Sequence, residues 1–268
     1  MQELPELEIY RALLAERFAG ATITAIQVHP EFDRATGDKL EQEIVNKTVW
    51  FVERRAELVV FHLDNGKRLT VSLTNDASLY VGGANEELDE QATVILRFDD
   101  RCLYLFCVEA KDVALLSVKE LEASMKGKGP DPLDKRLSFV RFVDRFAKKR
   151  SSLKTALVDP NILSGIGPVY SDEIMFEAKL RPEKKLTELE PEAWERLYAA
   201  TGHILRDAIS HGGVRVSPLF ASDSFTGGYR ERLHVHGLDG EPCKRCGGTI
   251  KKVSIAGRKS YCCPDCQK

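Results

Sequence analysis

The sequence predicts an α+β protein built from an N-terminal β-sandwich with a leading helix, a helical domain and a small C-terminal β-hairpin. Three observations predict this fold class. Residues 1–125 contain short β-rich runs after one helical segment, and residues 126–232 show helical periodicity instead. Five of the seven cysteines lie in the last 26 residues, within a third segment at residues 233–268. We therefore expect three domains with these bounds.

The leading helix is predicted at residues 4–20, because apolar side chains recur there at helical spacing before a glycine. The residues that set this spacing are Leu7, Tyr10, Leu13, Leu14 and Phe18, and Gly20 is the stop signal. Short β-rich runs follow, separated by turn signals such as Asp64-Asn65-Gly66. These predicted strands cover residues 21–28, 48–55, 57–63, 68–73, 92–98 and 102–108. They indicate an antiparallel sandwich or barrel with one helix in front of it.

The segment KGKGPDPLDKR at residues 126–136 marks a domain boundary, because it holds two glycines and two prolines. Apolar residues then recur at helical spacing in residues 137–150, 152–159, 169–180 and 191–211. Gly212-Gly213 ends the last of these helices. Residues 214–232 carry few apolar side chains and several glycines and serines, so we expect a loop there.

Composition limits the classes of function. The 268 residues are 43% hydrophobic and 30% charged, as in a soluble globular protein with room for two cores. With a net charge of −2 and a pI of about 6.3, a polyanion would have to bind at local basic patches. No apolar run approaches the ~20 residues that span a bilayer, and no secretory signal is visible. We expect a cytoplasmic protein without a membrane partner.

The strongest single motif is a pair of C-x-x-C sequences near the end of the chain. Its four cysteines are Cys243, Cys246, Cys263 and Cys266, a spacing that suits a tetrahedral zinc ion with four thiolate ligands. Such a site leaves no open coordination position, so the zinc should be structural and hold together a hairpin too short to fold alone. A chance grouping of cysteines is the alternative. Cys262 is expected to be a bystander.

The segment between the two cysteine pairs is basic. Residues 256–258 are expected to form the tip of the hairpin, with Arg258 projecting. Residues 241–268 contain seven basic side chains and two acidic ones: Lys244, Arg245, Lys251, Lys252, Arg258, Lys259 and Lys268 against Glu241 and Asp265. A basic hairpin with a tip arginine is suited to gripping a phosphate. An ordinary solvated charged face is the alternative.

A second basic run precedes a glycine turn. In residues 146–159 the basic side chains are Lys148, Lys149, Arg150 and Lys154. Gly165 and Gly167 then permit a tight turn, and a helix that starts near Pro168 would offer backbone N–H groups to an anion. An ordinary turn between two helices is the alternative.

Taken in order, these motifs resemble those of the formamidopyrimidine-DNA glycosylase and endonuclease VIII family. The opening MQELPELE is similar to the family's MPELPEVE, RRAEL resembles its RRGKYL, and GPDPL resembles its linker. The stretch LKTALVDPNILSGIGPVYSDEIMFEAKLRP resembles the family's helix–two-turns–helix. VHGLDGEPCKRCGGTI and GRKSYCCPDCQ resemble its C-terminal zinc finger. The match runs from end to end.

The resemblance implies a base-excision repair protein that flips a damaged base out of double-stranded DNA and removes it. In the family, the N-terminal amine of a proline attacks the sugar C1′ and forms a Schiff base, while the adjacent glutamate transfers protons. Carried over to this sequence, the catalytic positions are Gln2, Glu3 and Glu6. The DNA-binding positions are Lys154, Gly167, Tyr170 and Arg258. We also expect a structural zinc, a monomer and an association with the nucleoid.

The sequence departs from the family at the nucleophile. Gln2 stands where the family has its proline, and glutamine offers no secondary amine. Its large side chain predicts inefficient removal of the preceding methionine, which would leave the free amine on Met1. A displacement of one residue, up to ~3.5 Å, exceeds what attack on C1′ tolerates. Glu3 and Glu6 match the family's two glutamates, although a carboxylate that favours a helix N-terminus is the alternative for Glu3.

Further departures fall on positions that contact DNA in the family. Glu57 replaces a phosphate-binding lysine, Pro168 replaces an asparagine that bonds the DNA backbone, and Asn75 replaces a methionine wedge. Residues 108–113 lack the family's arginine–phenylalanine pair, and Lys111 is the only basic side chain left in this segment. Leu238 replaces an arginine of the family. We also hypothesise that Glu57 pairs with the amine of Met1 and keeps it protonated.

Three functions stay open on these residues. The first is a DNA glycosylase with a weakened or lost AP-lyase step, in which Glu3 activates water or the amine of Met1 attacks. The second is a non-catalytic protein that binds damaged DNA on the same scaffold. The third is a protein that no longer binds DNA. We expect the first, with residues 214–232 as the lesion-recognition loop.

Overall fold

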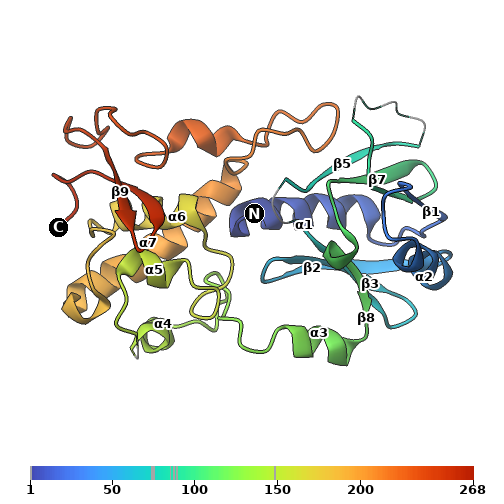
Figure 1. The fold of residues 1–268 in the computed structure, drawn as a ribbon, viewed down its shortest axis with the longest axis horizontal. Coiled ribbons are helices and arrows are strands. Elements are labelled where there is room, and N and C mark those ends of the chain that lie inside the picture. The colour runs from blue at the N-terminus through green and yellow to red at the C-terminus, as the bar shows by residue number, and fades with distance from the viewer. Residues whose placement is uncertain (1, 74–75, 85, 87, 89, 148) are drawn as a thin grey trace. The chain divides into compact units, whose positions relative to one another are not determined.

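The computed structural model describes residues 2–73, 76–84, 86, 88, 90–147 and 149–268 (Figure 1). The chain forms two compact units. The first contains Gln2, Glu6–Lys126 and Arg215–Thr226, and the second contains Glu3–Pro5, Gly127–Val214 and Gly227–Lys268. Contacts therefore join the cysteine-rich segment to the helical segment, and they join residues 215–226 to the first unit. The division into three domains at residues 125 and 232 stays a prediction.

The first unit is built on two four-stranded antiparallel sheets, which confirms the predicted β-sandwich. One sheet has the order β1 (Ala25–Val28), β6 (Val94–Arg97), β7 (Arg101–Phe106) and β5 (Ser78–Gly83). The other has the order β2 (Val49–Arg55), β3 (Leu58–Leu63), β4 (Arg68–Ser72) and β8 (Val113–Leu116). Side chains alternate between the core and the outer face, so that Leu79 and Val81 of β5 are buried while their neighbours are less so.

Helices complete the first unit. Helix α1 (Leu4–Phe18) buries the side chains that predicted it, among them Leu7, Leu14 and Phe18. Helices α2 (Arg34–Ile44) and α3 (Val118–Ser124) and the short η1 (Ala110–Asp112) were not predicted. Their few apolar residues give weak periodicity, and caps define their starts: the Asp33 side chain accepts from the Thr36 N–H, and Ser117 accepts from Glu120.

Helices dominate the second unit before the cysteines. They are α4 (Phe139–Phe146), α5 (Leu153–Leu157), α6 (Pro168–Glu177), η2 (Leu186–Glu188), α7 (Pro191–Ser210) and η3 (Gly228–Arg232). Helix α6 is the centre of this unit, because its residues from Tyr170 to Phe176 are all buried. Helix α7 packs against it through apolar residues such as Leu197 and Leu205. In the described part of the chain, no helix has the length and apolar character needed to cross a membrane.

The hairpin of the second unit consists of β9 (Lys251–Ile255) and β10 (Arg258–Cys262). Ala256 and Gly257 alone make the turn, with φ angles of 49° and 78° that suit a two-residue turn between twisted strands. Arg258 therefore pairs with Ile255 as the first residue of β10, instead of lying in the tip as expected, and its side chain is exposed.

Candidate functional site

Glu3 of the second unit lies at the N-terminus of α6. Its carboxylate accepts hydrogen bonds from the backbone N–H groups of Gly167 (2.7 Å), Val169 (2.9 Å) and Tyr170 (3.2 Å). The first N–H groups of a helix have no partner within the helix, and the helix dipole favours negative charge there. The anion that the glycine turn was predicted to bind is therefore the protein's own carboxylate. The alternative expected for Glu3 was a carboxylate that favours a helix N-terminus. Its carboxylate does lie at a helix N-terminus, and that helix is α6.

The turn before α6 is shaped to receive this carboxylate. A Cβ atom on Gly167 would lie 2.6 Å from the Glu3 carboxyl carbon, so any other residue here would displace the carboxylate from its position. Gly165 has a φ of 81°, and its carbonyl accepts from the Leu4 N–H at 2.8 Å. Pro168 is the first residue of the helix and is exposed; the N–H group it lacks would have no partner within the helix.

Gln2 and Glu6 belong to the first unit, where both side chains are buried. The Gln2 side-chain amide donates to the Ala77 carbonyl at 3.3 Å, and its backbone N–H donates to the Leu73 carbonyl at 3.4 Å. Glu6 is 3% exposed on α1. Burial raises the pKa of Tyr10 well above its usual value, and the Glu6 charge acts in the same direction. The Gln2 side chain thus fills a packed position and offers no amine.

Lys154, on α5, is fully buried in the second unit. Its ammonium donates to Asp172 Oδ1 (2.7 Å), to Ser171 Oγ (2.8 Å) and to the Pro168 carbonyl (2.8 Å). Burial lowers the pKa of Lys154, and the charge of Asp172 opposes that shift. The ammonium thus ties α5 to the first turn of α6. Direct phosphate contact by Lys154 stays a prediction.

Asp172 and Glu173, both fully buried on α6, connect that helix to the C-terminal segment. Asp172 accepts from Lys154 and also from Ser260 Oγ on β10 (2.5 Å), and it lies 2.8 Å from His236 Nδ1. Glu173 accepts from the backbone N–H groups of residues 234, 235 and 236. These residues were not predicted as part of a site. Two adjacent acids inside the apolar run VYSDEIMF were the signal that could have indicated buried, paired carboxylates.

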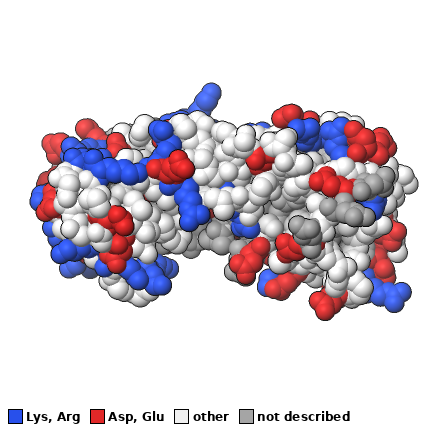
Figure 2. Space-filling view, turned by 90° about the horizontal axis from the view of Figure 1, so that it is seen from above, with Lys and Arg blue, Asp and Glu red and all other residues white. Residues whose placement is uncertain are grey.

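The other predicted DNA-binding positions differ in exposure. The Tyr170 side chain is fully buried and its ring lies 6.0 Å from that of Tyr229. Arg258 is exposed, and Figure 2 shows lysine and arginine side chains gathered over the part of the second unit that carries the hairpin. Contacts of Lys154, Gly167, Tyr170 and Arg258 with DNA stay predictions.

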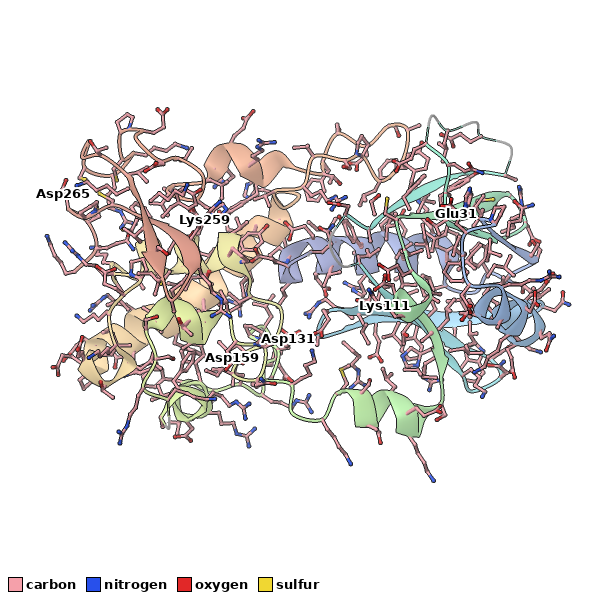
Figure 3. All side chains as sticks on the ribbon, viewed as in Figure 1. Glu31, Lys111, Asp131, Asp159, Lys259 and Asp265 are labelled. Atoms are coloured by element: carbon pink, nitrogen blue, oxygen red, sulfur yellow. The ribbon has the colours of Figure 1, made fainter. Side chains whose placement is uncertain are left out.

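The sites of the remaining departures are varied. Glu57 lies in the two-residue turn between β2 and β3, while Met1 and Asn75 lie outside the described residues, so the pairing of Glu57 with Met1 stays a hypothesis. Lys111, labelled in Figure 3, is 67% exposed and pairs with Glu109 at 2.8 Å. Leu238 packs against the apolar cluster of the cysteine-rich segment, which explains an apolar side chain there.

The predicted recognition loop is irregular up to η3. Its first part, Arg215–Thr226, belongs to the first unit. The Asp223 carboxylate accepts from the N–H groups of Leu219, Phe225 and Thr226, and the Leu219 carbonyl accepts from the Val81 N–H at 2.7 Å. The three Asp223 bonds brace the loop internally, and the bond from Val81 holds it against β5, while the Phe225 side chain stays 49% exposed.

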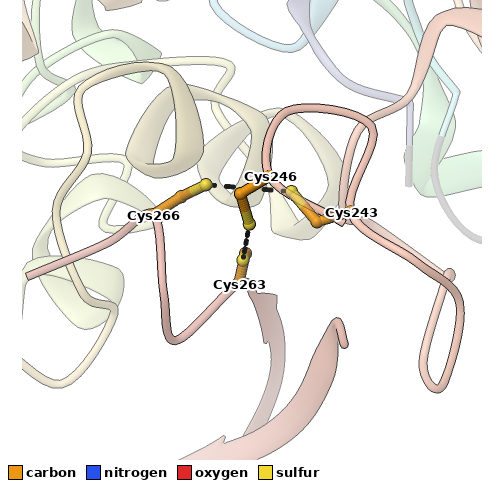
Figure 4. Close-up of side chains that lie close together, drawn as sticks. All are labelled: Cys243, Cys246, Cys263 and Cys266. Carbon is orange, nitrogen blue, oxygen red and sulfur yellow. Dashed lines mark hydrogen bonds between the residues drawn. The ribbon is translucent and has the colours of Figure 1, made fainter. Parts of the chain in front are cut away.

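The four predicted cysteine ligands converge (Figure 4). All four sulfurs lie within 4.8 Å of one another. The Sγ atoms of Cys243 and Cys266 are 3.8 Å apart, and those of Cys246 and Cys263 are 3.5 Å apart. Four sulfurs at ~2.3 Å from one zinc ion lie ~3.8 Å from each other in a regular tetrahedron. The donor set and its spacing therefore fit a structural zinc, and Cys262 is not one of the ligands.

Comparison with known protein families covers most of the chain. Residues 1–111 match the formamidopyrimidine-DNA glycosylase N-terminal domain, and residues 128–218 match the H2TH domain of the same glycosylase. Residues 240–268 match a zinc finger found in FPG and IleRS. The chain belongs to the formamidopyrimidine-DNA glycosylase family. This confirms the resemblance seen in the sequence, the fold and the zinc finger.

Individual members of the family match over their full length. The formamidopyrimidine-DNA glycosylase of Listeria innocua is 33% identical over 275 residues, covering all of both chains. That of Heliobacterium modesticaldum is 31% identical, again over both whole chains. The structure of Lactococcus lactis Fpg in complex with DNA containing an abasic site superposes with a TM-score of 0.88 at 27% identity, covering 99% of each chain. A complex of a Lactococcus lactis mutant with Fapy-dG-containing DNA gives the same TM-score.

Proposed function

We propose that this protein is a DNA glycosylase that removes damaged bases from double-stranded DNA by hydrolysis, with little or no AP-lyase activity. Relatives that match this chain over their full length are named formamidopyrimidine-DNA glycosylases. The similar solved structures are complexes with abasic or damaged DNA. The observation that carries the proposal is the contrast at the start of the chain. Glu3 is held in a shaped site, while the residue in the position of the proline is a glutamine whose side chain is packed against Ala77. This role also implies a location with the nucleoid.

Glu3 suits the hydrolytic part of this reaction. A carboxylate that accepts several N–H bonds is stabilised in its ionised form. An ionised carboxylate can accept a proton from an attacking water, and it can stabilise the positive charge that develops at C1′ as the glycosidic bond breaks. The three bonds from α6 fix its position, which such catalysis requires. While Met1 remains attached, the backbone nitrogen of Gln2 is an amide and cannot form the iminium that β-elimination needs.

The test separates base release from strand cleavage. A duplex with one Fapy-dG is incubated with the protein, and half of each sample is treated with alkali. We expect strand breaks only after alkali, because hydrolysis leaves an intact abasic site. Glu3→Gln should remove the breaks, whereas Glu16→Gln, an exposed change on α1, should keep them.

Borohydride trapping on an abasic duplex and the intact mass of the protein complete the experiment. The mass shows which residue carries the free amine. We expect no trapped adduct. An adduct that forms as fast as base release would overturn the proposal and show that an amine still reaches C1′.

The second candidate is a non-catalytic protein that binds damaged DNA. The observation that favours it is the engagement of Glu3: the carboxylate is 5% exposed and already accepts three hydrogen bonds. Tight, salt-sensitive binding to the same duplex without any base release would select this candidate.

A further inference from the structure

His236 is an ionisable side chain at the point where the helical part of the second unit meets the hairpin. Its Nδ1 atom lies 2.8 Å from Asp172 Oδ2, and its side chain is 23% exposed. The ring meets the Tyr261 ring edge-on, with centroids 5.0 Å apart. The ring is thus held on two sides and still reaches solvent.

The bond to Asp172 determines which nitrogen faces outward. The carboxylate accepts a hydrogen bond, so Nδ1 carries a proton in both charge states of the ring. In the described structure Nε2 has no hydrogen-bond partner. In the neutral ring Nε2 carries a lone pair, which repels an anion. In the protonated ring Nε2 carries a hydrogen, and this charged N–H group can donate to an anion. Lys154 balances the charge of Asp172, so this carboxylate does not oppose an anion at His236.

The hairpin places Arg258 near this histidine. Ser260 donates to the same Asp172 carboxylate from β10, and Arg258 precedes it by two residues, on the same face of the strand. Arg258 is also near enough to Lys154 to lower the pKa of that ammonium, although burial is the main cause. Both residues are therefore linked to one buried carboxylate: His236 through its own bond to Asp172, and Arg258 through Ser260 on the same face of β10.

We propose that His236 is a proton-dependent contact for a DNA backbone phosphate beside Arg258, so that DNA binding tightens as the pH falls. The proposal rests on the proposed function, because it assumes that the second unit meets DNA. The ligand is a phosphodiester, which a charged N–H donor next to a guanidinium recognises.

The charged groups around His236 favour this role. Helix α6 contributes Asp172 and Glu173. The Glu173 carboxylate already accepts hydrogen bonds from the backbone N–H groups of residues 234–236. Helix α5 contributes Lys154, and β10 contributes Arg258 and the phenol of Tyr261. The neighbouring His234 is 39% exposed and lies 3.3 Å from Glu173 Oε2. His234 is thus a matched histidine with its own carboxylate partner.

The test measures affinity for one duplex at pH 6.0 and pH 8.0, the range in which histidines change charge, at several salt concentrations. We expect about a tenfold tighter Kd at pH 6.0, since one charged contact is worth about that much. The slope of log K against log salt should also steepen by about 0.9, the value for one added phosphate contact. His236→Gln should lose both changes, and His234→Gln should keep them. His236→Arg should bind tightly at both pH values.

The outcomes are distinct. Zinc content and the unfolding midpoint show that each variant is folded. If His236→Gln keeps the full pH response, the inference is wrong and the proposed function stands. If the natural protein binds no duplex at either pH, the proposed function fails, and this inference fails with it.

Discussion

Replacing Glu3 with glutamine tests whether its carboxylate holds the second unit together. The change keeps the shape of the side chain and removes its charge. The amide oxygen can keep the two bonds made by Oε2, from Gly167 and Tyr170. The new NH₂ group then faces the Val169 N–H, which loses its acceptor. An unsatisfied N–H costs about 1–3 kcal/mol, and a bond to a neutral acceptor is about 1 kcal/mol weaker than one to a charged acceptor.

The loss of charge at the helix terminus adds about 0.3–1 kcal/mol. We therefore expect Glu3→Gln to lower the free energy of unfolding of the second unit by about 3–6 kcal/mol, the sum of these contributions. The assay is urea unfolding followed by tryptophan fluorescence in a Trp50→Phe background. Trp194 of α7 then reports on the second unit alone. With a typical m-value of about 2 kcal/mol/M, the midpoint should fall by about 1.5–3 M.

Glu16→Gln in the same background is the matched control. Glu16 lies on α1 and its side chain is 73% exposed, so this change should cost less than about 0.5 kcal/mol. Equal midpoints for the two variants would refute the reasoning and show that α6 does not depend on the carboxylate.

Three further predictions follow from the second unit. Lys154→Met should destabilise it by about 3–5 kcal/mol, because Asp172 stays buried without its ammonium partner; adding Asp172→Asn should recover part of this loss in a double-mutant cycle. A zinc chelator, or Cys263→Ser, should remove amide-exchange protection from β9 and β10, whereas Cys262→Ser should retain one zinc per chain by metal analysis. Burial raises the pKa of Glu173, but hydrogen bonds from residues 234–236 outweigh burial, so its folded pKa is below the usual value. The stabilisation is then complete above the unfolded pKa of about 4.3 and is lost as the pH falls through the folded pKa; urea midpoints between pH 6 and pH 3 should fall less steeply for Glu173→Gln, and an unchanged slope would contradict this assignment.

The sequence predicted the features that depend on local patterns. Helix α1 follows from apolar spacing, and the zinc site follows from the cysteine spacing, because each is written within a short stretch of chain. Helix α2 was missed because only a few of its residues, such as Leu40 and Ile44, face the core. The place of Arg258 in β10 could have been predicted, since a two-residue turn at Ala256-Gly257 is sufficient for a tight hairpin.

The candidate site was predictable in its residues but not in its contacts. The glycine turn before α6 correctly indicated an anion site, yet its occupant, Glu3, lies 164 residues from Gly167 along the chain. Periodicity and motif spacing carry no information over that distance without a family resemblance. The same holds for Asp172, whose partners Ser260 and His236 are brought to it by tertiary packing alone.

The engagement of Glu3 with α6 has a consequence for how the protein is made. A ribosome adds about 5–20 residues per second, so Glu3 waits roughly 8–30 seconds for the N–H groups it will bind. During that time the β-sandwich of the first unit can form, while residues 3–5 still lack their partners in the second unit. A separately expressed fragment of residues 127–268 would lack Glu3 and Leu4, both of which contact this unit. We expect such a fragment to regain stability when a short peptide of the first residues is added back.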